Sequence, residues 1–140
     1  MNSKILITPL KIINNDKGNV YHGLKVRDKG YIDFGEAYFS KIIFNKVKAW
    51  KRHKKMTVNI ILPIGKILLV TIDNRDNDKE IIQEIILSEK NYNRITIPPK
   101  IWFGFKGLSK SFSLVCNIAD IKHNKNECDD RPINFFEYKW

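Results

Sequence analysis

Residues 57–72, TVNIILPIGKILLVTI, decide the fold class of this chain. Thr57 to Leu62 and Lys66 to Ile72 are aliphatic, β-branched runs of strand length, and Pro63-Ile64-Gly65 between them is a tight-turn sequence. Similar short runs recur at 4–7, 10–13, 34–44, 95–97 and 112–118, while 81–87 fits either a strand or a short helix. Gly, Pro, Asn and Asp separate these runs at roughly even spacing. This pattern predicts an all-β sandwich or barrel.

The chain contains 140 residues, which suits one domain with a real core. No linker, heptad or internal repeat divides it, so we expect residues 1–140 to form a single domain. Residues 1–10 lack the apolar centre of a signal peptide, and no apolar run approaches the roughly 18 residues of a membrane span. Cys116 and Cys128 have no metal-site spacing. We therefore expect a reduced, cytoplasmic protein.

The net charge of +10 indicates an anionic partner such as a nucleotide, a nucleic acid or an acidic glycan. The lysines are spread along the whole chain, without a basic arm or an RNA-binding signature. A nucleic-acid-binding barrel is therefore the weakest of the charge-based interpretations, because nothing except the charge favours it.

Residues 50–57, WKRHKKMT, place His53 among four cations between two predicted strands. Neighbouring cations favour the neutral imidazole, which can accept a proton, and they would also attract an anionic substrate such as a diphosphate. His53 is thus a candidate general base beside a phosphate-binding surface. The alternative is a basic turn with a solvated histidine, because charge runs are usually exposed faces.

Several pieces of the chain, taken in order, resemble the dTDP-4-dehydrorhamnose 3,5-epimerase family of cupins. The strand 47–53 ends in a histidine as the family's does, and Gly65, Asp73 and Arg75 match the glycine turn and the Asp-x-Arg strand end that follow. The segments 87–88, 95–99 and 104–105 continue the pattern with Leu-Ser, a strand into an Ile-Pro turn and a Gly-Phe pair. The resemblance covers residues 34–120 well and the termini loosely.

This resemblance implies a cupin-type double-stranded β-helix, that is, a jelly-roll barrel. It also implies a homodimer, a site in the barrel mouth, His53 as the catalytic base, and no metal or other cofactor. Metal-binding cupins carry a second histidine two residues away, where this chain has Lys51. The expected substrate is a sugar attached to a nucleoside diphosphate, and its enolate would need nearby positive charge.

The chain departs from the family at several positions. Trp50, Lys51 and Arg52 replace the arginine-glycine-leucine run before the histidine, and Phe103 replaces a later histidine. The family's acid tyrosine follows the last long strand, but residues 117–120 read NIAD. We therefore consider Tyr38, Tyr92 and Asp120 as replacement acids, each with a structural role as the alternative.

The candidate substrate-binding residues are Trp50, Lys51, Arg52, Lys54, Lys55, Asn59 and Trp102. The two tryptophans could stack on a base or a sugar, or could fill the barrel. The cations could hold a diphosphate, but strand alternation allows only one or two of them inside. Asn59 is unusual in an apolar strand and favours a polar pocket. Asp73 and Arg75 favour a structural pair, and the aromatic residues of 135–140 predict a closing flap or a dimer contact.

The leading hypothesis is an epimerase that acts on a nucleoside-diphosphate-linked 4-keto-6-deoxy sugar through proton abstraction by His53. A ketoisomerase uses the same enolisation, so the sequence leaves that alternative open. A non-catalytic cupin that binds a nucleotide sugar or a glycan is the competing hypothesis, and the missing tyrosine favours it.

Overall fold

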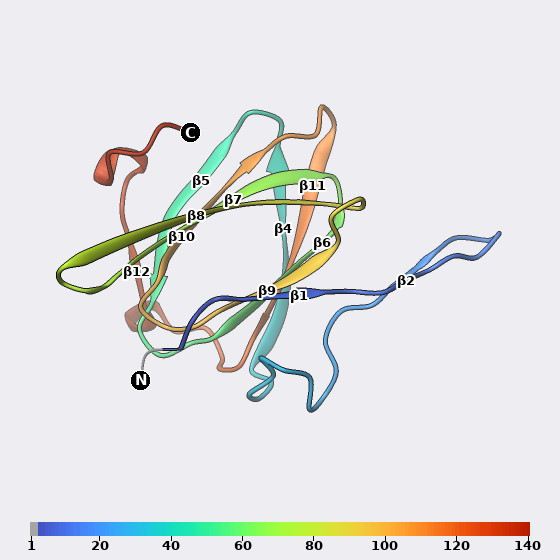
Figure 1. Cartoon of the computed structure of the whole chain (residues 1–140), viewed down its shortest axis with the longest axis horizontal. Helices are drawn as coiled ribbons and strands as arrows, with labels where there is room; N and C mark the ends of the chain where they lie inside the picture. Colours follow the sequence, from blue (N-terminus) through green and yellow to red (C-terminus); the bar gives the residue numbers. More distant parts are fainter. Residues whose placement is uncertain (1–2) are drawn as a thin grey trace.

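The computed structural model describes residues 3–140, and almost every regular element in them is an antiparallel β-strand (Figure 1). The strands are β1 (Leu6–Pro9), β2 (Ile12–Ile13), β3 (Val20–Tyr21), β4 (Glu36–Ile43), β5 (Val47–His53), β6 (Val58–Ile64), β7 (Lys66–Asp76), β8 (Lys79–Ser88), β9 (Asn93–Ile97), β10 (Trp102–Gly107), β11 (Phe112–Ala119) and β12 (Cys128–Asp130). Two single 3-10 turns, η1 (Lys125–Glu127) and η2 (Ile133–Phe135), flank β12. No helix in the described part of the chain has the length and apolarity needed to cross a membrane.

Two five-stranded sheets, with orders β1-β9-β6-β11-β4 and β12-β5-β10-β7-β8, form the body of the molecule. Their inner faces enclose an aliphatic core that includes Ile42, Val58, Ile67, Leu69 and Val115. Along β11 buried residues alternate with partly exposed ones, as expected for a strand with one face on a core. This arrangement confirms the predicted all-β fold and is that of a cupin jelly-roll.

The structure differs from two of the elements predicted from the sequence. Residues 81–87 belong to the strand β8, because pairing along nearly the whole length of β7 outweighs their local ambiguity. Pro63 lies inside β6 rather than in the turn, at a point where the register with β11 shifts. Such an irregularity tolerates a residue that cannot donate a ladder hydrogen bond.

The reversal between β6 and β7 depends on Gly65. Its φ is +97°, in the region that favours glycine, and a Cβ there would lie 2.4 Å from the Ser113 hydroxyl oxygen. The β2–β3 hairpin, by contrast, projects from the body, as the blue segment of Figure 1 shows.

Candidate functional site

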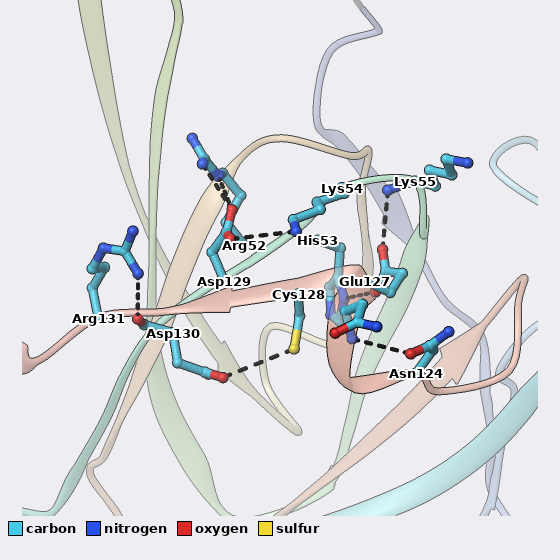
Figure 2. Close-up of polar contacts among 11 residues, drawn as sticks. Arg52, His53, Lys54, Lys55, Asn124, Glu127, Cys128, Asp129, Asp130 and Arg131 are labelled. Atoms are coloured by element: carbon cyan, nitrogen blue, oxygen red, sulfur yellow. Dashed lines mark hydrogen bonds and ion pairs between the residues drawn. The ribbon is translucent and has the colours of Figure 1, made fainter.

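The centre of the candidate site is a buried pair formed by His53 and Glu127. The Nδ1 atom of His53, the last residue of β5, lies 2.7 Å from Oε2 of Glu127 (Figure 2). The other oxygen of Glu127, Oε1, accepts hydrogen bonds from the backbone N–H groups of Lys55 and Met56 at 3.0 and 2.9 Å. One carboxylate oxygen therefore anchors Glu127 to the backbone that follows β5, and the other holds the imidazole of His53.

Local chain geometry brings Glu127 to this place. Asn124 caps the 3-10 turn η1 by accepting a hydrogen bond from the N–H of Asn126. The backbone N–H of Lys54 donates to the Glu127 carbonyl at 2.8 Å, and β12 then continues antiparallel to β5 with Cys128 opposite His53. Glu127 thus enters the barrel immediately before an edge strand that pairs with the histidine's own strand.

The charge of Glu127 determines which ring nitrogen of His53 carries the proton. Burial alone would raise the pKa of Glu127, but the hydrogen bonds from Lys55, Met56 and His53 outweigh it, and the pKa is lowered. The carboxylate is ionised at neutral pH and can only accept, so Nδ1 of His53 donates to it, and in the neutral imidazole the single ring proton lies on Nδ1. Its Nε2 then has a free lone pair, and this buried atom has no protein partner. This tautomer is the one a general base requires.

A cavity of about 300 Å³ lies between β4 and β11 on one side and β5, β10 and β12 on the other. His53 and Glu127 do not line it themselves, and Phe103 connects the pair to it. Phe103 stacks on the His53 ring, with 5.9 Å between centroids, and also lines the cavity. The polar lining residues are Tyr38, Ser40, Lys48, Lys51, Asn117, Asp130 and Arg131. Three cations against one carboxylate make this cavity suited to an anion.

Tyr38 reaches the cavity from β4, opposite Asn117 of β11 in the sheet register. Burial is the main cause that raises the pKa of Tyr38, and the charge of Glu36 adds to it. The hydroxyl is therefore protonated at neutral pH and able to donate a proton. Of the three candidate acids, Tyr38 alone lines this cavity.

The other two candidate acids lie elsewhere. The Tyr92 hydroxyl donates to the backbone carbonyl of His22 at 2.7 Å, which is a structural contact. Asp120 accepts from the N–H of Thr57 at 2.8 Å and lines a different cavity, beside Pro98 and Pro99. Neither position supports a proton-donating role next to His53.

The cationic run divides between the two faces of β5, as strand alternation requires. Lys51 faces the cavity on the side of His53. Arg52 faces outward, where Nε and Nη2 bind Asp129 at 3.1 and 2.8 Å and the guanidinium lies 4.5 Å from the Trp102 ring centroid. Lys54 is exposed, 3.9 Å from Asp129. Arg52 and Lys54 lie beside Asp129 (Figure 2) and do not line the cavity.

The other predicted binding residues lie mostly outside the cavity. Trp50 and Trp102 are 1% and 2% exposed and pack beneath residues 135–140 on the outer face of their sheet. Trp50 also borders the cavity, whereas Trp102 does not. Asn59 lies on the outer face of the other sheet, where it donates to the Gly30 carbonyl and accepts from Thr96. Lys55 contributes its backbone N–H to Glu127, while its exposed side chain borders the cavity of Asp120.

Asp73 and Arg75 form the expected structural pair, with the Arg75 Nη2 2.7 Å from a carboxylate oxygen of Asp73. Sequence reasoning missed Glu127, Asp130 and Arg131. They belong to a polar stretch that resembles an ordinary loop, and only the pairing of β12 with β5 brings them to the site. In residues 3–140 no three His, Cys, Asp or Glu side chains gather in a way that could hold a metal ion.

No family model matches the chain. A solved dTDP sugar isomerase from Desulfovibrio desulfuricans G20 is 33% identical, with a TM-score of 0.92 over 97% of this chain and 90% of that protein. A dTDP-6-deoxy-D-glucose-3,5-epimerase from Legionella pneumophila, solved with dTDP-4-keto-L-rhamnose, is 17% identical and shares the fold, with a TM-score of 0.80 over 92% of this chain and 73% of that one.

A curated relative, the probable low-salt glycan biosynthesis epimerase Agl13 of Haloferax volcanii, is 26% identical over 111 residues, which are 77% of this chain and 71% of that protein. The chain belongs to the dTDP-4-dehydrorhamnose 3,5-epimerase family of cupins, which comprises dTDP-sugar epimerases and isomerases.

Proposed function

We propose that this protein is an isomerase that enolises a 4-keto-6-deoxy sugar attached to a nucleoside diphosphate, with dTDP as the nucleotide. The observation that carries the proposal is the unpartnered, buried Nε2 of His53, whose opposite nitrogen is held protonated by Glu127. A base in this state, connected to a cationic cavity through Phe103, is suited to remove a proton next to a carbonyl.

In the proposed reaction, Nε2 of His53 takes the proton from a carbon adjacent to the sugar ketone. The electrons of the broken C–H bond form the enolate double bond, and negative charge develops on the ketone oxygen. Lys51, on the same face of β5 as His53, supplies positive charge to that oxygen. The imidazolium that forms is stabilised by the Glu127 carboxylate.

Tyr38 is the proposed acid that returns a proton to the enolate. Delivery to the same carbon from the opposite side inverts its configuration and gives an epimerase. Protonation of the former carbonyl carbon, with loss of the hydroxyl proton from the carbon that His53 deprotonated, would instead move the ketone and give a ketoisomerase. The position of Tyr38 on the sheet that faces β5 favours delivery from the side opposite the base, and therefore epimerisation.

The diphosphate is proposed to lie against Lys48, Lys51 and Arg131, which replace Arg52, Lys54 and Lys55 in this role. The alternative function is a binding protein that holds a nucleotide sugar without converting it. Its support is the segment 117–120, NIAD, which lacks the family's acid tyrosine and whose Asn117 lines the cavity.

The test is incorporation of deuterium from D₂O into dTDP-linked 4-keto-6-deoxy sugars. We expect exchange in the wild type and a loss of about 10² to 10⁴ in His53→Asn, the usual worth of general acid–base catalysis. Bound nucleotide should be retained in that variant, because the proposed phosphate contacts are intact. Nucleotide binding with no exchange in the wild type would establish the binding protein instead.

We further propose a homodimer formed through the outer face of β4. Phe39 and Ile43 project from this edge strand with 64% and 51% of their surface exposed. An apolar edge strand is a pairing surface unless it is covered, and a second copy would cover it. Sedimentation should give a dimer at micromolar concentration, and Phe39→Glu should give a monomer; a monomeric wild type would refute the assembly.

Free thiols at Cys116 and Cys128 support a cytoplasmic location.

A further inference from the structure

Residues 131–140 cross the outer face of the sheet that contains β5 and run beside that strand (Figure 1). Three of their aromatic side chains, Phe136, Tyr138 and Trp140, surround the Trp50 ring with centroid distances of 5.3, 6.0 and 5.0 Å. We call these three residues the aromatic latch. Trp140 also lies against Gly104, where a Cβ would be only 3.0 Å from its Cζ2 atom.

The latch continues directly from the segment that carries Glu127. After β12, the backbones of Trp50 and Arg131 exchange two hydrogen bonds of 2.9 and 3.0 Å, and the Trp50 indole N–H donates to the Ile133 carbonyl at 3.2 Å. β12 itself is a three-residue edge strand. So short a strand pairs weakly on its own, because its few hydrogen bonds barely offset the conformational entropy that the segment loses when it is ordered.

We infer that the aromatic latch is a positioning device for the catalytic pair: by packing on the back of β5 it holds β12 in register and keeps Glu127 on His53. Trp50 is three residues from His53 on the same strand, and Cys128, next to Glu127, is opposite His53. Loosening the latch frees β12, and the imidazole then loses the acceptor that fixes its proton on Nδ1. The inference rests on the proposed function only for its kinetic consequence.

The first test needs no substrate. Nitrogen NMR of the folded protein reports which imidazole nitrogen of His53 carries the proton, and His53→Asn identifies the signal among the three histidines. We expect the wild type to be in the Nδ1–H tautomer and Trp140→Ala to show a mixed or inverted population. Trp140→Phe should restore the wild-type signal, because the Trp140 indole N–H has no hydrogen-bond partner to lose.

The matched control is Phe112→Ala, which removes an aromatic ring from a partly buried position on the other sheet. It should lower the melting temperature without changing the His53 tautomer. Tyr138→Ala provides a second opening of the latch if Trp140→Ala does not fold. A folded latch variant with the wild-type tautomer, or a control that shifts the tautomer equally, would overturn the inference.

The kinetic test is deuterium exchange into the 4-keto sugar. Since a misplacement of about 1 Å can cost about 10²-fold, we expect Trp140→Ala to lower kcat by about tenfold to a hundredfold, with KM within about twofold. An unchanged kcat in a variant whose tautomer has shifted would refute the coupling to catalysis. If the wild type shows no exchange, the proposed function fails, while the tautomer measurement still decides the role of the latch.

Discussion

The Glu127 carboxylate lies 2.7 Å from Nδ1 of His53, although 74 residues separate the two in the chain. The same carboxylate accepts two backbone N–H bonds from the residues just after the histidine's strand. This combination requires an acceptor with two oxygens, which a glutamate side chain has and a glutamine side chain lacks.

Glu127→Gln should disable His53 although its size is unchanged. A carboxamide has one oxygen, so it cannot accept from both the backbone amides and Nδ1–H. With its oxygen on the amides, its NH₂ group faces Nδ1 and forces the proton to Nε2, which removes the free lone pair. We expect solvent-proton exchange to fall by about 10² to 10⁴, as when an orienting carboxylate is lost from a catalytic histidine.

The measurement for Glu127→Gln is the exchange rate together with the His53 nitrogen spectrum. Glu127→Asp serves as a control for charge: it retains the carboxylate on a shorter side chain and should keep part of the activity. Full activity in the Gln variant would show that Glu127 does not set the tautomer.

Lys51 and Lys54 provide a matched pair for the nucleotide site. Lys51 lines the cavity, whereas the Lys54 side chain is 52% exposed and lies toward Asp129. A hydrogen bond to a charged group is worth about 1.5–3 kcal/mol, so Lys51→Ala should weaken dTDP binding roughly tenfold to a hundredfold. Lys54→Ala removes the same charge and should leave affinity within about twofold. Calorimetry measures both, and equal losses would refute the assignment.

The lowered pKa of Glu127 also predicts how stability depends on pH. A carboxyl group with a depressed folded-state pKa contributes stability above its unfolded value, which is 4.5 for glutamate, and loses it as pH falls through the folded value. The melting temperature of the wild type should thus fall below about pH 4.5. Glu127→Gln should start lower at neutral pH and fall less steeply; parallel curves would contradict the shift.

The sequence was informative where structure depends on local pattern. Residues 57–72 carry β propensity that their long-range pairing reinforces, so the strands and the Gly65 reversal were predictable. The contact of Trp50 and Trp102 with residues 135–140 was not predictable, because it joins β5 and β10 to a segment far along the chain. Glu127 gave no local signal at all, since its role depends on an edge strand that pairs with β5 from far along the chain.

Alanine substitutions at Gly65 and Gly18 distinguish the cost of backbone strain from the cost of a steric clash. Both have positive φ, +97° and +127°, but a Cβ at Gly65 would lie 2.6 Å from the Ser113 Cα, whereas one at Gly18 would meet nothing within 4 Å. Gly18→Ala should cost about 1–3 kcal/mol for the unfavourable φ. Gly65→Ala should cost that amount plus about 1–3 kcal/mol for overpacking, because the backbone of β11 must move. Chemical denaturation measures both, and similar losses in the two variants would show that the Ser113 contact does not constrain the turn.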